Sequence, residues 1–308
     1  MAAQVFLEHA AGYDDPNLDR LTGELLRLSG CCPASGERVL VKPNLVAPSN
    51  TALSCTHPAV VRAVCRYLAD CGARITVGDS PAFGTARIMA RICGLDRALA
   101  GLPVTLVNFT RPRQIKLTLS GSIGVASQAL DADFLVNIPR FKVHDQMLCT
   151  FAVKNFFGCV AGFRKSLAHQ RHGEKANRFE SLIYDVFLTL PPSVSLVDGV
   201  AAMHGRGPAK GRPYPLGLLG ASADAVALDA ALCAVLGLGP DATPLGREGL
   251  RRGLFSGAVY PLAGPETFNA EGFELPGELS PVAFRPCRFA RGRVKSLRVR
   301  LLGGGSRQ

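Results

Sequence analysis

Hydrophobic residues along the chain fall into two patterns: short uninterrupted runs, and longer stretches with an apolar residue every three or four positions. Short uninterrupted runs are typical of strands that are buried on both faces of a sheet. The strands expected from these runs cover residues 4–9, 38–42, 73–77, 103–107, 114–119, 133–138, 194–197 and 216–220. The second pattern predicts helices over residues 16–29, 56–72, 84–93, 147–157, 177–190 and 222–236.

Strands and helices alternate in this order, which is typical of βαβ units. We therefore expect an α/β fold with a mainly parallel, doubly wound sheet and helices on both faces. Thr56 and Ser222 stand at the starts of two expected helices and are predicted to be N-caps. Residues 1–245 should form this domain, and residues 246–308 a C-terminal extension that packs on it and includes a final strand at 294–300.

The composition is typical of a folded protein, and the sequence shows neither a membrane span nor a signal peptide. Of the 308 residues, 47% are hydrophobic, which is enough for a sizeable core and excludes a disordered chain. No uncharged apolar run approaches the ~18 residues of a membrane span. The first ten residues lack the basic region of a signal peptide. We therefore expect a cytoplasmic protein without a membrane span.

Positive charge is concentrated at the C-terminus. The net charge is +11, and residues 281–308 contribute +8 of it through seven Arg and one Lys without any acidic residue. Two interpretations remain open: a strand with a solvated basic face, or an arm that binds phosphate polymers or a membrane surface. Nucleic-acid binding is disfavoured, because the remaining residues carry only +3 and the chain has no Trp and five Tyr for stacking on bases.

Ten cysteines are present, and no two have the CxxC spacing of a zinc ribbon, a ferredoxin box or a thioredoxin site. Most are expected to be small buried residues. Cys149 and Cys159 differ because they bracket the most polar motif, so they remain weak candidates for a metal or a cluster. Together with His169 and His172 they match no standard zinc spacing.

Polar residues gather where four expected strands end, at 42–44, 78–80, 139–144 and 198–199. Ligands of parallel α/β sheets bind at the carboxyl ends of the strands. Lysine is scarce, with eight residues against 27 Arg, yet Lys42, Lys142 and Lys154 all fall in or beside these stretches. This placement favours one shared site.

The same stretches resemble a known family, the domain-of-unknown-function family 362 (DUF362). The similar segments are VLVKPNLV (39–46), 56–81, DFLVNIPRFKVH (133–144), TFAVKNFFGCVAGFRKSLAHQ (150–170), VDGVAAMHGRGP (197–208) and 218–237. Many members resemble iron–sulfur proteins because they carry an appended eight-cysteine ferredoxin segment, which this sequence lacks. A redox role implied by the resemblance would need an external electron donor such as ferredoxin.

The resemblance places the family's polar positions on Lys42, Asn44, Asp79, Lys142, His144, Lys154, Asn155, His169, Asp198, Asp224 and Asp229. Converging cations are costly without a counter-anion, which would be either Asp79 and Asp198 or a substrate carboxylate or phosphate. His144 is suited to general acid–base catalysis, or fastens a loop by hydrogen bonds. Asp229 lies among alanines, and we expect it to bind a lysine or to face the site.

These residues lead to a functional hypothesis. We expect an enzyme that acts on a small anionic substrate, with Asp79, Lys142 and His144 as the catalytic group. The binding group is Lys42, Asn44, Arg140, Lys154, Asn155, His169, Asp198 and Asp229. The reaction is expected to be oxidoreductase-like, with an iron–sulfur cluster as the candidate cofactor. The alternatives are a non-redox lyase, isomerase or ligase with the same pocket, and a nucleic-acid or membrane-surface binder that uses the tail.

Overall fold

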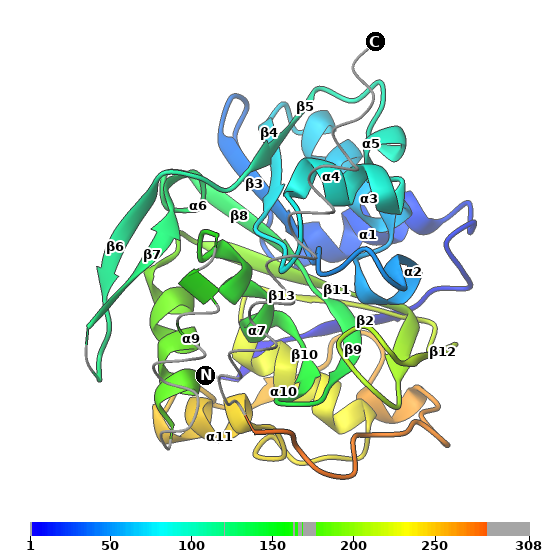
Figure 1. Ribbon diagram of the computed structural model, residues 1–308. Helices are drawn as coiled ribbons and strands as arrows, with labels where there is room; N and C mark the ends of the chain where they lie inside the picture. The colour runs from blue at the N-terminus through cyan, green and yellow to red at the C-terminus, as the bar shows by residue number, and fades with distance from the viewer. Residues whose placement is uncertain (1, 120, 163, 166–167, 169–176, 282–308) are drawn as a thin grey trace.

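The computed structural model describes residues 2–119, 121–162, 164–165, 168 and 177–281 (Figure 1). The strands are β1 (Ala3–Gln4), β2 (Phe6–His9), β3 (Arg38–Pro43), β4 (Arg74–Asp79), β5 (Val104–Asn108), β6 (Pro112–Lys116), β7 (Ser122–Ala126), β8 (Phe134–Ile138), β9 (Arg140–His144), β10 (Leu148–Thr150), β11 (Ser193–His204), β12 (Arg212–Tyr214), β13 (Leu218–Ser222) and β14 (Ala258–Val259). The helices are α1 (Leu18–Leu28), α2 (Thr51–Ser54), α3 (Pro58–Asp70), α4 (Ala86–Cys93), α5 (Leu95–Ala98), α6 (Ser127–Leu130), α7 (Ala152–Phe156), α9 (Arg178–Thr189), α10 (Ala225–Val235) and α11 (Pro244–Arg251), with short 3-10 helices η1 (Phe157–Cys159) and η2 (Pro265–Thr267).

The main sheet has the order β5-β4-β3-β8-β11-β13-β2. Its first five strands run parallel to their neighbours, and β13 is antiparallel to both β11 and β2. Beyond Pro139 the chain continues as β9, which pairs with the far end of β11 after a shift of register. The parallel ladder explains the short apolar runs, because each strand is covered on both faces.

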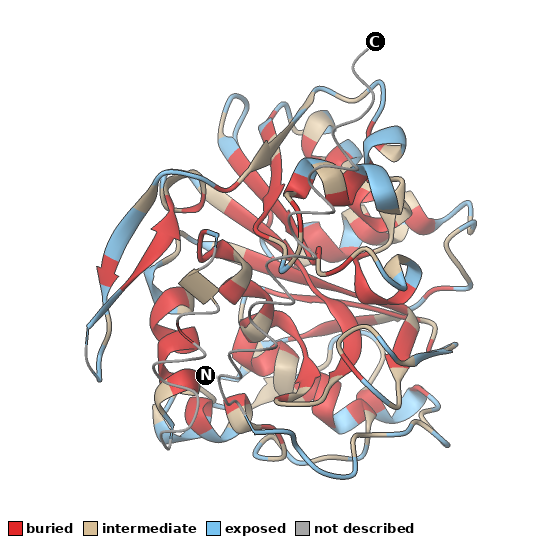
Figure 2. Ribbon diagram, in the orientation of Figure 1, coloured by how far each residue is buried: buried red, intermediate tan, exposed pale blue. Residues whose placement is uncertain are grey.

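Two apolar clusters lie on opposite faces of the sheet, because successive side chains of a strand point to opposite sides. Val39 and Val41 of β3 face one cluster, with α1, α3, α4 and α5, while Leu40 faces the other, with α7, α9 and α10. Figure 1 shows these two groups of helices on either side of the sheet, and Figure 2 shows that burial follows the sheet between them. The predicted fold class is therefore confirmed.

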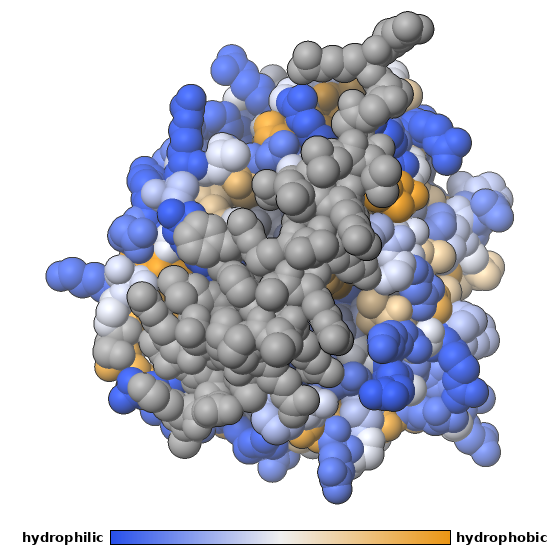
Figure 3. Space-filling model, in the orientation of Figure 1, coloured by the Kyte–Doolittle hydropathy of each residue, from blue (hydrophilic) through white to orange (hydrophobic). Residues whose placement is uncertain are grey.

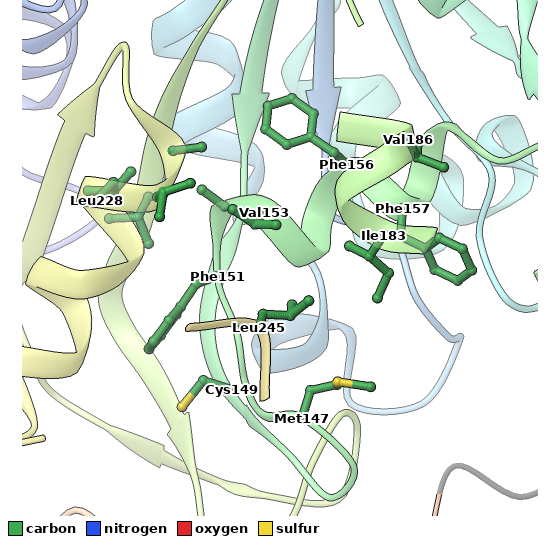
Figure 4. Packing of buried hydrophobic residues seen from close by; sticks show 14 of the residues in the cluster. Met147, Cys149, Phe151, Val153, Phe156, Phe157, Ile183, Val186, Leu228 and Leu245 are labelled. Carbon is green, nitrogen blue, oxygen red and sulfur yellow. The ribbon is translucent and has the colours of Figure 1, made fainter. Parts of the chain in front are cut away.

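Helix α7 has only five residues and is held in place by packing rather than by its own length. Val153 and Phe156 of α7 are buried, as are Ile183 of α9 and Leu228 of α10 (Figure 4). The Phe156 ring also stacks on Phe187, with centroids 5.0 Å apart. This packing fixes α7, and with it the residues that point from α7 toward the sheet edge.

Some local expectations were wrong. Residues 147–157 are not one helix, because Leu148–Thr150 forms strand β10 before α7 begins. The expected strand at 114–119 is shorter and pairs with β7 in a separate hairpin. Neither predicted N-cap is one: His57 caps α3 and Asp224 caps α10, each by accepting backbone N–H groups.

The described part of the C-terminal extension packs on the domain. Strand β14 pairs with β1, and the backbone N–H of Ala263 donates to the Leu7 carbonyl at 3.2 Å. The strand predicted at 294–300 lies outside the described residues. On the face drawn in Figure 3, the visible apolar residues are scattered among hydrophilic ones. This matches the exposed large apolar side chains, which come from separate elements.

Candidate functional site

An ion pair lies at the carboxyl ends of two neighbouring strands. Lys42 Nζ of β3 is 3.0 Å from Asp79 Oδ1 of β4, and both side chains are buried. Lys42 also donates to the Pro43 carbonyl at 3.1 Å and to Asn155 Oδ1 at 3.3 Å. Asp79 accepts the backbone N–H groups of Leu45 and Ser80, both at 2.8 Å. Each charge is thus compensated within the protein.

Side-chain amides extend this pair into a buried polar network. Asn44 Nδ2 donates to Asn155 Oδ1 at 2.5 Å, and Asn155 Nδ2 donates to Asn137 Oδ1 at 2.8 Å. Asn137 in turn donates to Ser195 Oγ at 3.0 Å. Lys142 enters the network by donating to Asn44 Oδ1. We call Lys42, Asn44, Asp79, Lys142 and Asn155 the inner cluster.

Lys142 differs from Lys42 because it has no carboxylate partner. Its Nζ donates to Asn44 Oδ1 and to the Ser54 carbonyl, which are neutral acceptors. Among the described residues no carboxylate lies within 4.0 Å of this amine. Burial lowers the pKa of Lys142 to about 7, and the charges of Arg140 and Lys154 act in the same direction. Lys142 can therefore gain or lose a proton near neutral pH.

Arg140 forms a second, separate ion pair. Its Nη1 lies 2.5 Å from Asp198 Oδ2, and both side chains are fully buried. Asp198 also accepts the Tyr13 hydroxyl at 2.9 Å and the His57 backbone N–H at 2.8 Å. Strands β9 and β11 place the two residues opposite each other. Arg140 and Asp198 thus fasten β11 to Tyr13 and to the start of α3.

Two partly exposed lysines flank the inner cluster, and we call Lys154 and Lys165 the outer lysines. Lys154, on α7, makes no hydrogen bond within the described part of the chain, and its Nζ lies 5.9 Å from the Phe157 ring centroid. Lys165 donates to the Ser80 carbonyl. Burial lowers the pKa of each to about 8, with mutual repulsion adding to the shift of Lys154.

Glycine 158 allows the backbone of η1 to rest directly on the inner ion pair. A Cβ at this position would overlap with Lys42 Nζ and Asp79 Oδ1. Lys42 is therefore covered by backbone, whereas the outer lysines keep access to solvent.

The other predicted residues are placed differently. His144 Nδ1 accepts the backbone N–H of Gln146 at 3.1 Å, a contact that fastens the turn between β9 and β10. Asp229 neither binds a lysine nor joins the cluster; its oxygens accept the N–H groups of Ala152 (2.6 Å) and Val153 (3.1 Å) at the start of α7. Burial raises the pKa of Asp229 to about 8. His169 and His172 lie outside the described residues.

The two candidate metal-binding cysteines have different surroundings. Cys149 belongs to the apolar cluster that includes Phe151 and Leu245 (Figure 4), and burial raises its pKa well above the usual range. Cys159 lies near Lys42 and Asp79, and burial raises its pKa to about 12. In the metal-free protein both thiols are therefore protonated at neutral pH. Within the described residues, no three His, Cys, Asp or Glu side chains are grouped to hold a metal.

Lys165 is the residue that the sequence reasoning missed. It lies in the segment 150–170, which holds two of the eight lysines of the chain, Lys154 and Lys165. The lysine count that drew attention to Lys42, Lys142 and Lys154 applied equally to it. Lys165 was not singled out because it lies farther along the chain from an expected strand end than Lys154 does.

Fold and site together define an α/β protein with a lysine-rich polar cluster at the carboxyl edge of its parallel sheet. The family model for the domain of unknown function DUF362 matches residues 39–234. A thylakoid-associated protein from Synechocystis sp. is 36% identical over 272 residues, covering 87% of this chain and 85% of the relative. The chain belongs to the DUF362 family, which confirms the resemblance seen in its sequence.

Similarity to solved structures is weaker. The lactate racemase apoprotein from Thermoanaerobacterium thermosaccharolyticum has a TM-score of 0.44 and 12% identity, covering 73% of this chain and 58% of its own. A protein from Thermotoga maritima has a TM-score of 0.41 and 14% identity, covering 61% of this chain and 50% of its own. In the described part of the chain, no helix has the length and apolar character needed to cross a membrane.

Proposed function

We propose that this protein is an enzyme that binds a small anionic substrate, a carboxylate or a phosphate, at the outer lysines. The observation that carries the proposal is the excess of amines at the carboxyl edge of the sheet. Lys42, Lys142, Lys154 and Lys165 lie near this edge, and within the described part of the chain only Lys42 has a carboxylate, Asp79, within 4.0 Å. Such an excess is costly unless an anion compensates it.

The inner cluster supports a catalytic role beneath the bound anion. Amines whose pKa lies near neutral pH exchange protons readily, and Lys142, with a pKa of about 7, has this property. Lys142 is therefore proposed as the proton donor or acceptor, with Asp79 holding Lys42 in place. His144 stays a second candidate, since it lies two residues beyond Lys142 on the same strand.

Binding of small anions tests the proposal directly. Isothermal titration calorimetry and thermal shift with a panel of carboxylates and phosphates should reveal ligands of the wild-type protein. The double variant Lys154→Met/Lys165→Met should lose most of this binding. The control Lys116→Met/Lys210→Met removes two exposed lysines and the same net charge, and should bind like the wild type.

Two results would contradict the proposal: no anion of the panel stabilises the protein, or the outer-lysine variant binds as tightly as the control. The reaction class needs a further measurement. Anaerobic purification followed by an absorption spectrum and metal analysis separates an iron–sulfur-linked reaction from a non-redox lyase, isomerase or ligase.

A further inference from the structure

The charges of the site are not equally compensated. Lys42 has Asp79 and Arg140 has Asp198, each as an ion pair within hydrogen-bonding distance. Lys142, Lys154 and Lys165 have no carboxylate within 4.0 Å among the described residues. Glu180 on α9 attracts Lys154 only from beyond that distance. The part of the site that a ligand can reach therefore has an excess of two ammonium groups, with a third beneath them.

Hydrogen-bond donors are in excess at the same place. An ammonium group has three N–H donors. Lys154 uses none of them within the described residues, and Lys165 uses one on the Ser80 carbonyl. Three donors from Lys154 and two from Lys165 are thus left for a ligand. A carboxylate has two oxygens and one charge, whereas a phosphoryl group has three terminal oxygens and up to two charges.

We infer that the substrate carries a phosphoryl group, bound as a dianion between Lys154 and Lys165. This inference rests on the proposed function and narrows its substrate class from small anions in general to phosphorylated compounds. A dianion compensates both outer lysines, and a monocarboxylate leaves one of them uncompensated. The covered position of Lys42 beneath Gly158 means that the inner ion pair stays intact when the ligand binds.

The charges that act on the outer lysines also favour a bound dianion. Asp79, Lys42 and Cys159 act electrostatically on the pKa of Lys165, and Lys165 and Glu180 act on that of Lys154. Most of these influences on the outer amines come from groups that are cationic or protonated at neutral pH, and Asp79 is already shared with Lys42. A bound dianion would favour the protonated form of both outer lysines.

Titration calorimetry with methyl phosphate, sulfate and acetate tests the inference. At pH 7.5 the Kd for methyl phosphate and for sulfate should be at least about tenfold lower than the Kd for acetate. The second ionisation of a phosphate monoester lies near pH ~6. Affinity for methyl phosphate should therefore rise from pH 5 to 7, while affinity for sulfate stays flat. Both should fall above pH ~8, as the outer lysines lose their protons.

The outcomes separate the inference from the proposed function. If acetate binds as tightly as methyl phosphate, or if affinity for methyl phosphate is flat from pH 5 to 7, the dianion inference is wrong and anion binding stands. If none of the three anions binds, both fail. Lys154→Met and Lys165→Met should each weaken methyl phosphate binding at least about tenfold, and Lys116→Met should leave it unchanged. Equal effects of all three substitutions would also overturn the inference.

Discussion

Removal of the Lys42 amine should destabilise the protein, and removal of the Lys154 amine should not. In Lys42→Met, the buried Asp79 carboxylate loses the partner that lies 3.0 Å away. Breaking a buried pair in this way costs about 3–5 kcal/mol. Asp79 keeps the two backbone N–H groups of Leu45 and Ser80, so the lower end, about 3 kcal/mol, is expected.

In Lys154→Met no carboxylate within 4.0 Å loses its partner among the described residues. The change removes a contact with the Phe157 ring, which contributes at most about 1 kcal/mol, and relieves repulsion with Lys165. The free energy of unfolding should therefore stay within about 1 kcal/mol of the wild type. For a chain of this size, about 3 kcal/mol lowers Tm by roughly 5 °C.

The assay is urea and thermal unfolding of the ligand-free protein, with Lys210→Met as an exposed control. Asp79→Asn and the double variant Lys42→Met/Asp79→Asn complete a mutant cycle. Since the double variant leaves no unpaired charge, it should lose less stability than the sum of the single changes. The reasoning fails if Lys42→Met is as stable as Lys210→Met, or if Lys154→Met loses as much stability as Lys42→Met.

Further predictions concern Lys142, Gly158 and the tail. Lys142 has a pKa of about 7 in the folded protein and about 10.4 in the unfolded chain. The free energy of unfolding of the wild type, relative to that of Lys142→Met, should therefore rise between pH 7 and 10, by up to about 1.4 kcal/mol per pH unit. Urea unfolding that gives the same difference between the two proteins at pH 7 and at pH 9 would refute this. Gly158→Ala should cost about 1–3 kcal/mol because its Cβ overlaps with Lys42 and Asp79, whereas Gly12→Ala, which has no neighbour there, is the control in the same thermal-shift assay. Truncation after Pro281 keeps the Gln146–Pro281 contact and should leave methyl phosphate affinity unchanged; a folded truncated protein that no longer binds would contradict this.

Strand ends were the most informative feature of the sequence. Apolar runs followed by Lys42-Pro43-Asn44 and by Asp79 predicted that these side chains would meet, since parallel strands end at one edge of the sheet. The structure brings Lys42 and Asp79 into contact, and it connects Asn44 directly to Lys142 and, through Asn155, to Lys42. Their role in substrate binding stays a prediction.

Contacts between segments far apart in the chain could not be predicted from the sequence. Tyr13 reaches Asp198 across 185 residues, and nothing near either residue indicates the partner. The polar surroundings of Asp229 were equally hidden, because capping of α7 depends on how α10 packs against it. His57 rather than Thr56 caps α3 because the Thr56 hydroxyl donates to the Ile138 carbonyl and accepts the Asn44 N–H. Tertiary contacts thus decided among local alternatives that propensity alone treats as equal.

The choice of lysine at this site has a physical reason in a chain that otherwise uses arginine. Four of the eight lysines lie in the inner cluster or flank it, whereas Arg140, among the described arginines, is held in a full ion pair with Asp198. Arginine stays charged at any physiological pH, but a lysine amine gives up its proton when burial makes the charge costly. Four permanent cations around Asp79 would repel one another in the empty site. Amines with pKa values of about 7 and 8 limit that repulsion without a ligand, and they become charged again when an anion arrives. The lowered pKa values that limit repulsion in the ligand-free cluster therefore also allow its amines to take up protons when an anion binds.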